Sequence, residues 1–182
     1  MILVVLAILA CVGCFVGVSI IAPSMVFTDP VKIQSTAESI SAITPPPGYD
    51  PTFAMDVMGM VSMVIYGDMN ADGDHMLMLM SFPVGVNQQE MQSKMKNNLE
   101  QQGQGKNINV SESTGETFQV RGEETVVTID KGSDSSGKEL RQIYFTFTSI
   151  KGGPAMFMMV MPEEEWSDGG QQAFKETIAS ME

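Results

Sequence analysis

The N-terminal stretch constrains this chain most, because no charged side chain occurs from Ile2 to Thr28. Twenty helical residues rise about 30 Å, which matches the hydrocarbon thickness of a bilayer. We therefore expect residues 2–22 to bind the membrane as one transmembrane helix, within an N-terminal anchor of residues 1–28. A cleaved signal peptide is the alternative. Such a peptide begins with basic residues, and none precedes Ile2 here.

Small residues form a stripe along this apolar segment. Ala10, Gly13 and Gly17 recur at helical spacing, and the two glycines form a G-x-x-x-G pattern. Such a pattern lets two membrane helices approach closely, so these residues are candidate helix–helix contacts of a homodimer. Glycine is also simply common in membrane helices. Both cysteines of the chain lie in the same segment, where they are expected to act as small apolar packing residues.

The rest of the chain, residues 29–182, has the length of a single domain and is acidic. The sequence holds 22 acidic and 10 basic residues, a formal net charge of -12. This balance argues against nucleic acid as a partner, because phosphate backbones need clustered Lys and Arg. A short uncharged N-terminus followed by an acidic domain favours translocation of that domain. We expect a single-pass membrane protein with an extracytoplasmic domain, periplasmic or at the cell surface.

Three helices are expected in this domain. Asp29 and Pro30 are typical of a helix start, and apolar residues at helical spacing follow, predicting a helix near 30–42. Met91, Met95 and Leu99 predict an amphipathic helix over 88–102. Ser167 and Asp168 are expected to cap a last helix, with Phe174, Ile178 and Met181 on one face.

Stretches of strand-forming residues lie between these helices, separated by glycine-rich or polar turns. The predicted strands cover 54–60, 61–66, 75–82, 107–111, 116–121, 124–130, 140–150 and 155–161. The second and third should form a hairpin. Leu77 and Leu79 alternate with Met76, Met78 and Met80, so the third strand is apolar on both faces, as expected where helices cover both sides of a sheet. The predicted fold class is α+β, an antiparallel sheet with flanking helices, preceded by one transmembrane helix.

Several sequence features resemble one known family. The run Ile43-Thr44-Pro45-Pro46-Pro47-Gly48-Tyr49 precedes the first strands, Val120-Arg121-Gly122 forms a corner between later strands, and a helix over 174–180 closes the chain. With the mid-chain helix, this order resembles the PsbP/Mog1/DcrB-like α-β-α sandwich domains, over nearly all of residues 43–182. The resemblance implies a binding or accessory role, and it supplies no catalytic residues and no cofactor.

The sharpest local motif is an acidic loop. Asp68, Asn70, Asp72 and Asp74, with Gly73, match the first half of a calcium-binding loop. The second half does not match, because Leu79 stands where the bidentate glutamate belongs. A hairpin turn explains the same residues. These four residues are therefore candidate Ca²⁺ ligands only if a carboxylate from elsewhere completes the site.

Methionine is the second unusual feature, with 17 residues in the chain. Met76, Met78 and Met80 share one face of a strand and follow His75, the only histidine. Thioethers and imidazole are suitable soft ligands for Cu(I), so these four residues are candidate copper ligands. Flexible methionines also fill apolar cores, and a methionine-lined groove for a partner or lipid is a third interpretation.

Enzymatic function is not expected. One histidine and no cysteine beyond the apolar segment leave few ways to build a catalytic triad, and no nucleotide-binding or metalloprotease motif occurs. We expect a membrane-anchored, non-catalytic accessory or interaction domain with an unknown protein partner. The alternative is an extracytoplasmic metal-binding protein for Cu(I) or Ca²⁺.

Overall fold

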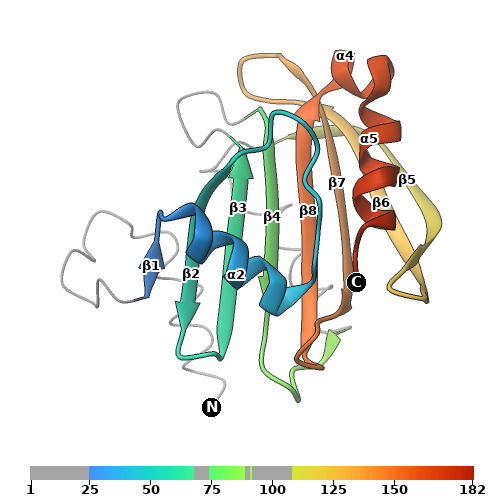
Figure 1. Ribbon diagram of the computed structural model, residues 1–182. Helices are drawn as coiled ribbons and strands as arrows, with labels where there is room; N and C mark the ends of the chain where they lie inside the picture. Colours follow the sequence, from blue (N-terminus) through green and yellow to red (C-terminus); the bar gives the residue numbers. More distant parts are fainter. Residues whose placement is uncertain (1–24, 68–73, 89–90, 92–107) are drawn as a thin grey trace.

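A computed structural model describes residues 25–67, 74–88, 91 and 108–182 (Figure 1). Its centre is one antiparallel sheet of eight strands in the order β1-β2-β3-β4-β8-β7-β6-β5. The strands are β1 (Val26–Phe27), β2 (Pro51–Val57), β3 (Val61–Gly67), β4 (Met76–Ser81), β5 (Asn109–Val120), β6 (Glu123–Ser133), β7 (Glu139–Thr148) and β8 (Pro154–Pro162). The hairpin predicted from the second and third strands is confirmed as β3–β4, with Ser62 opposite Ser81 and Tyr66 opposite Leu77.

Helix α2 (Pro30–Ile40) forms where the sequence predicts it. The carboxylate of Asp29 accepts a hydrogen bond from the backbone N–H of Lys32 at 3.1 Å, and Pro30 occupies the first turn. This arrangement satisfies one N–H group that has no partner within the helix. The helix ends at Ser41, which adopts an extended conformation ahead of the proline run.

One face of the sheet carries the hydrophobic core. Helix α2 and helix α5 (Gln171–Ala179) both lie on this face in Figure 1. Their apolar stripes meet fully buried side chains of the central strands, and Phe157 stacks on Phe145 with ring centroids 4.8 Å apart. The core residues from the helices and central strands include Ile33, Ala37, Ile40, Val64, Leu77, Leu79, Phe145, Phe157, Met159, Phe174 and Ile178. Alternation along β4 explains why Leu77 and Leu79 are buried here while Met76, Met78 and Met80 point to the other face.

The α-β-α sandwich predicted from the sequence is wrong. The structure is mostly one eight-stranded sheet, and helices α2 and α5 lie on a single face of it. Met76, Met78 and Met80 lie on the face away from α2 and α5, where they are half-buried. The predicted helix over 88–102 lies outside the described residues except at 88 and 91.

The described part of the chain contains no helix of the length and apolarity needed to cross a bilayer. Most of the predicted anchor, residues 1–24, lies outside the described residues. Val26 and Phe27, which the sequence analysis assigned to that anchor, pair with Met55 and Ala54 of β2 and belong to the sheet.

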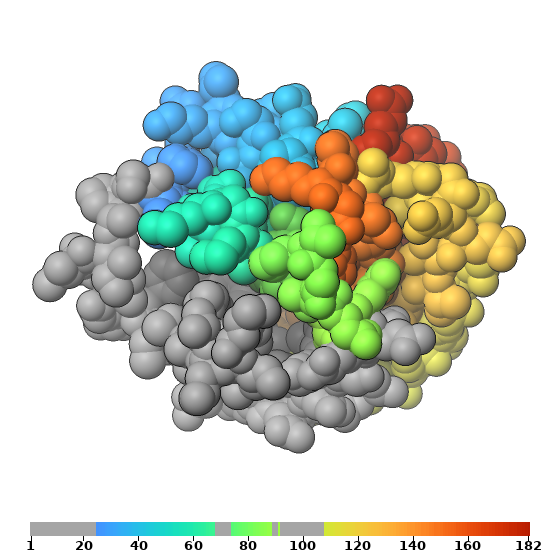
Figure 2. All heavy atoms as spheres, turned by 90° about the horizontal axis from the view of Figure 1, so that it is seen from below, coloured from blue at the N-terminus to red at the C-terminus, as the bar shows by residue number. Residues whose placement is uncertain are grey.

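The two ends of the sheet differ in their connections. One end carries the β2–β3 turn, the loop after β4, the β7–β8 turn and the β5–β6 turn, and Figure 2 views the molecule from this side. The chain enters the sheet at the same end, because the carbonyl of Met25 accepts a hydrogen bond from the backbone N–H of Asp56 at 2.9 Å. We call it the entry end. The other end holds the starts of β4 and β7 and the end of β8.

Candidate functional site

Charged side chains gather at the end of the sheet opposite the entry end. We call this group the polar end, and it consists of Asp74, His75, Lys131, Lys138, Arg141, Glu163 and Glu165. These residues come from the starts of β4 and β7, from β6, and from the short helical turn α4 (Glu163–Glu165) after β8. Because β4 and β7 both pair with β8, the topology brings these distant segments together.

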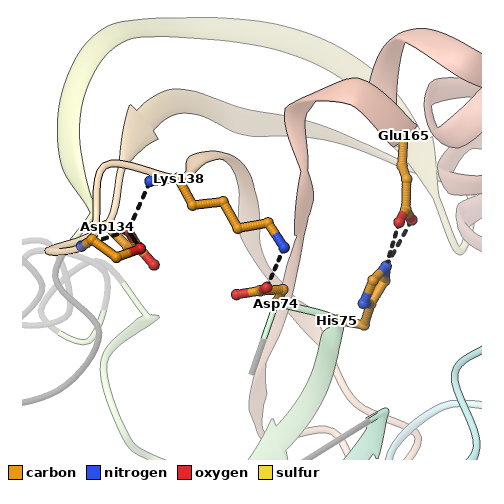
Figure 3. Close-up of polar contacts among 6 residues, drawn as sticks. Asp74, His75, Asp134, Lys138 and Glu165 are labelled. Carbon is orange, nitrogen blue, oxygen red and sulfur yellow. Dashed lines mark hydrogen bonds and ion pairs between the residues drawn. The ribbon is translucent and has the colours of Figure 1, made fainter. Parts of the chain in front are cut away.

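Asp74, a candidate calcium ligand, already contacts a cation. The Lys138 ammonium binds its Oδ2, and only 8% of the Asp74 side chain is exposed (Figure 3). Lys138 is positioned by a turn in which its backbone N–H donates to Asp134 Oδ1 at 2.9 Å. The Ser136 hydroxyl and the Lys138 N–H both donate to that carboxylate and lower the Asp134 pKa. A cation at Asp74 would therefore compete with the lysine.

His75 pairs with a glutamate 90 residues further along the chain. Its Nε2 lies 2.7 and 2.8 Å from the two carboxylate oxygens of Glu165 (Figure 3). The ring of Tyr49 meets the His75 ring edge-on, with centroids 6.0 Å apart. The Tyr49 hydroxyl donates to the Val160 carbonyl at 3.1 Å. Burial, and then the charge of Glu165, raises the Tyr49 pKa, so this tyrosine is a neutral hydrogen-bond donor.

A bidentate ion pair of the polar end joins β7 to α4. Arg141 donates from Nε and Nη2 to the two oxygens of Glu163 at 2.8 and 2.6 Å. The guanidinium also lies 5.6 Å from the ring centroid of Trp166, a cation–π arrangement. Lys131 adds a second cation 3.5 Å from the same carboxylate. The arrangement holds the segment after β8 against the sheet, which is a structural role.

The candidate copper ligands fall on two sides of β4. By alternation His75 shares the side of Leu77 and Leu79, where it meets Tyr49. The three methionines face the other side, where Met80 lies in register between Met63 of β3 and Met156 of β8. Met78 is likewise opposite Met158. The structure therefore brings methionines of neighbouring strands together and places the histidine elsewhere.

Other predicted site residues cannot be placed. Asp68, Asn70 and Asp72 of the acidic loop, and Ala10, Gly13 and Gly17 of the apolar segment, lie outside the described residues. Among the residues that are described, no three or more His, Cys, Asp or Glu side chains converge as a metal site would require. Sequence reasoning missed Lys138 and Arg141, and it treated the Glu163-to-Glu165 run as a solvated segment. Only the strand order reveals their partners.

Distant structural likenesses among solved proteins include LpqN and PA94. LpqN of Mycobacterium tuberculosis, described as involved in cell envelope biogenesis, has a TM-score of 0.40 and 10% identity, over 76% of this chain and 80% of its own. PA94 of Pseudomonas aeruginosa, a protein of unknown function described as a putative regulator, has a TM-score of 0.39 and 11% identity, over 75% and 94%. The PsbP/Mog1/DcrB-like resemblance is not confirmed.

Searches with protein-family models and against curated proteins found no match.

Proposed function

We propose that this chain is a membrane-anchored, non-catalytic interaction domain that presents its polar end to a protein partner on the extracytoplasmic side. One observation carries the proposal: the chain enters the sheet at one end, through Met25 and Asp56, and the ion pairs of the polar end lie at the other. A helix formed by residues 2–22 would therefore hold the entry end near the membrane and the polar end away from it.

The chemistry of the polar end suits recognition better than catalysis. Opposite charges pair within it, as in Lys138 with Asp74 and Arg141 with Glu163, and His75 contacts Glu165. A general base needs a free lone pair directed at a substrate, whereas the carboxylates of Asp74 and Glu163 accept hydrogen bonds from Lys138 and Arg141 within the protein. Trp166 and Arg141 are residue types enriched at the energetic centres of protein interfaces, and both lie at this end of the sheet.

Membrane fractionation of the full chain, made in bacterial cells, tests the anchor. We expect the protein in the membrane fraction, resistant to alkaline carbonate. A Val12→Arg variant should lose this association, because arginine at the centre of a membrane helix costs about 2.5–3.5 kcal/mol. Ser24→Arg, beyond the apolar run, is the matched control and should stay in the membrane. Wild-type protein that is soluble and keeps Met1 would contradict the proposal.

Protease treatment of intact and opened cells tests the orientation. An extracytoplasmic domain should be digested once the outer barrier alone is permeabilised, while a cytoplasmic marker survives. Capture of partners from detergent extracts should then depend on the polar end, so that Glu165→Lys, at a half-exposed residue of the polar end, lowers the recovery of a specific partner and Val31→Ala, at an exposed residue of α2, does not.

Metal binding is the second candidate function, and the methionines in register across β3, β4 and β8 favour it for Cu(I). Titration of the full chain in detergent with Cu(I) should raise its melting temperature stoichiometrically if the site exists. Met80→Leu, which keeps the volume but removes the sulfur, should abolish the shift. A titration that leaves the wild-type melting temperature unchanged removes this candidate.

A further inference from the structure

Exposed apolar side chains cluster at the entry end of the sheet. Met58 is 78% exposed, Met60 49%, Val84 73% and Ile150 50%. We call these four residues the apolar rim. They belong to three separate connections: the β2–β3 turn, the loop after β4 and the β7–β8 turn.

These connections lie side by side. Ser62, two residues after Met60, is opposite Ser81 at the end of β4. The backbone N–H of Phe82 donates to the Pro154 carbonyl at 2.9 Å, which joins the β4 loop to the β7–β8 turn. The approach is so close that a Cβ atom on Gly153 would lie 2.1 Å from the Phe82 carbonyl oxygen. Figure 2 shows the three segments next to one another, green-cyan, green and orange.

The β2–β3 turn holds Met58 outward by its backbone. Met58 and Gly59 both have positive φ, 53° and 68°, in a tight hairpin turn closed by the Met60 N–H and the Val57 carbonyl. Asp56 satisfies its carboxylate inside the turn, accepting from the Gly59 N–H at 2.6 Å and from the Ser62 hydroxyl at 3.2 Å. The β2–β3 turn therefore exposes the thioethers of Met58 and Met60, while the Asp56 carboxylate is engaged within the turn.

The rim lies next to the point at which the chain enters the sheet. Met25 is hydrogen-bonded to Asp56, two residues before Met58. From Ile21, at the end of the apolar N-terminal run, to Met25 there are four peptide steps, which span about 14 Å at full extension. A bilayer that contains residues 2–21 would thus hold this end of the sheet close to its surface.

We propose that the apolar rim inserts into the interfacial layer of the same bilayer, so that the sheet stands with its strands along the membrane normal. This inference rests on the proposed function, because it needs residues 2–22 to span the membrane. Exposed Lys151, next to Ile150, suits this position, because a lysine stem lies along apolar surface while its ammonium reaches the headgroups. The β5–β6 turn, with exposed Glu123 and Glu124, stays in water.

Spin labels on the full chain test the proposal. Cys11 and Cys14 are first replaced by alanine, and single cysteines are introduced as Met58→Cys, Ile150→Cys and, as control, Val110→Cys. Val110 is 51% exposed, like Ile150, but begins β5 at the opposite end of the sheet. Each protein is reconstituted in phosphatidylcholine vesicles, and flotation first shows whether the chain is anchored at all. A chain that does not float overturns the proposed function and the inference with it.

In vesicles that float with the protein, collisions with oxygen, which dissolves in lipid, are compared with collisions with a water-soluble nickel chelate. We expect the ratio of oxygen collisions to nickel-chelate collisions to be several-fold higher at positions 58 and 150 than at position 110. Equal ratios at the three positions, in protein that floats, would overturn the inference alone. Rim labels shielded from both reagents would also overturn it, by showing that protein covers the rim.

A charge substitution supplies a second measurement. Val84→Asp should lower the ratio at a label on position 58 toward the value at 110, because a carboxylate in the rim opposes insertion. Val126→Asp, at an exposed residue of β6, is the matched control and should leave the ratio unchanged. An unchanged ratio with Val84→Asp contradicts the proposed insertion.

Discussion

Arg141 and Glu163 form a bidentate ion pair that connects β7 to the helical turn after β8, with N–O distances of 2.8 and 2.6 Å. Their side chains are only 12% and 16% exposed. Removing one charge would leave the other partly buried without its partner. Glu163→Gln should therefore lower the free energy of unfolding by about 1–3 kcal/mol, measured by urea unfolding of the full chain in detergent.

Glu139→Gln is the control for this pair. Glu139 is 64% exposed and lies 3.4 Å from Lys131, so its loss should cost less than about 1 kcal/mol. Equal losses of unfolding free energy in the two variants would show that burial does not determine how much each ion pair stabilises the protein.

Tyr66 and Tyr49 should respond in opposite ways to the loss of their hydroxyl groups. The Tyr66 hydroxyl is buried and has no hydrogen-bond partner among the described residues, whereas the Tyr49 hydroxyl donates to the Val160 carbonyl. Tyr66→Phe should raise the free energy of unfolding by about 1 kcal/mol, and Tyr49→Phe should lower it by about 1 kcal/mol. A loss in both variants would mean that Tyr66 has a partner after all.

Alkaline pH should destabilise the domain through Tyr66. Burial, and then the charge of Glu38, raises the pKa of Tyr66 from 10.0 to about 12. Above about pH 10 an unfolded tyrosine loses its proton while folded Tyr66 keeps its own, so the unfolded state binds fewer protons and stability falls as pH rises from about 10 to 12. Wild type should lose more stability over this interval than Tyr66→Phe. Parallel curves would refute the assignment.

Gly132 of β6 lies so close to β5 that the structure leaves no room for a side chain. An added Cβ would lie 2.4 Å from the Asn109 carbonyl oxygen and 2.4 Å from Ile108 Cγ2. Gly132→Ala should cost about 1–3 kcal/mol, measured by thermal unfolding. Gly115→Ala is the control, since the Cβ there would meet Val126 Cγ1 at an ordinary 3.6 Å. A melting temperature equal to that of the control would contradict the close approach of β5 and β6.

Short sequence patterns predicted helix α2 and the central strands, because a few neighbouring residues determine where each of these elements begins. The Asp29 cap and Pro30 fix the start of α2 within four residues of chain, and the apolar runs located the central strands to within a few residues. The predicted break between 111 and 116 is wrong, because β5 is one continuous strand and Gly115 lies within it, paired with Thr128. The sequence alone does not distinguish a glycine with an extended backbone from a glycine in a turn.

The predicted start of the last helix is also wrong. Ser167 and Asp168 do not cap it; they lie in the distorted turn η1 (Trp166–Gly170), in which Asp168 and Gly169 are not helical. Helix α5 begins at Gln171, and its predicted apolar face, with Phe174 and Ile178 buried, is confirmed.

The candidate site was beyond sequence reasoning for a topological reason. His75 and Glu165 meet because β4 pairs with β8, and Arg141 meets Glu163 because β7 pairs with β8 on its other side. Nothing local in the chain specifies that β8, the last strand, sits between β4 and β7. The predicted α-β-α layers were wrong as well, because apolar residues on both faces of β4 do not specify which element packs against each face.

The outer edge of the sheet has a consequence for storage of the protein. Strand β5 ends the sheet on one side, and its residues from Asn109 to Thr117 are exposed, with Glu112 and Glu116 among them. A second molecule adding itself to this strand would bring carboxylates against carboxylates, which keeps solutions clear at neutral pH. Salt screens this repulsion, so association of molecules through β5 should begin when the ionic strength of the buffer is raised.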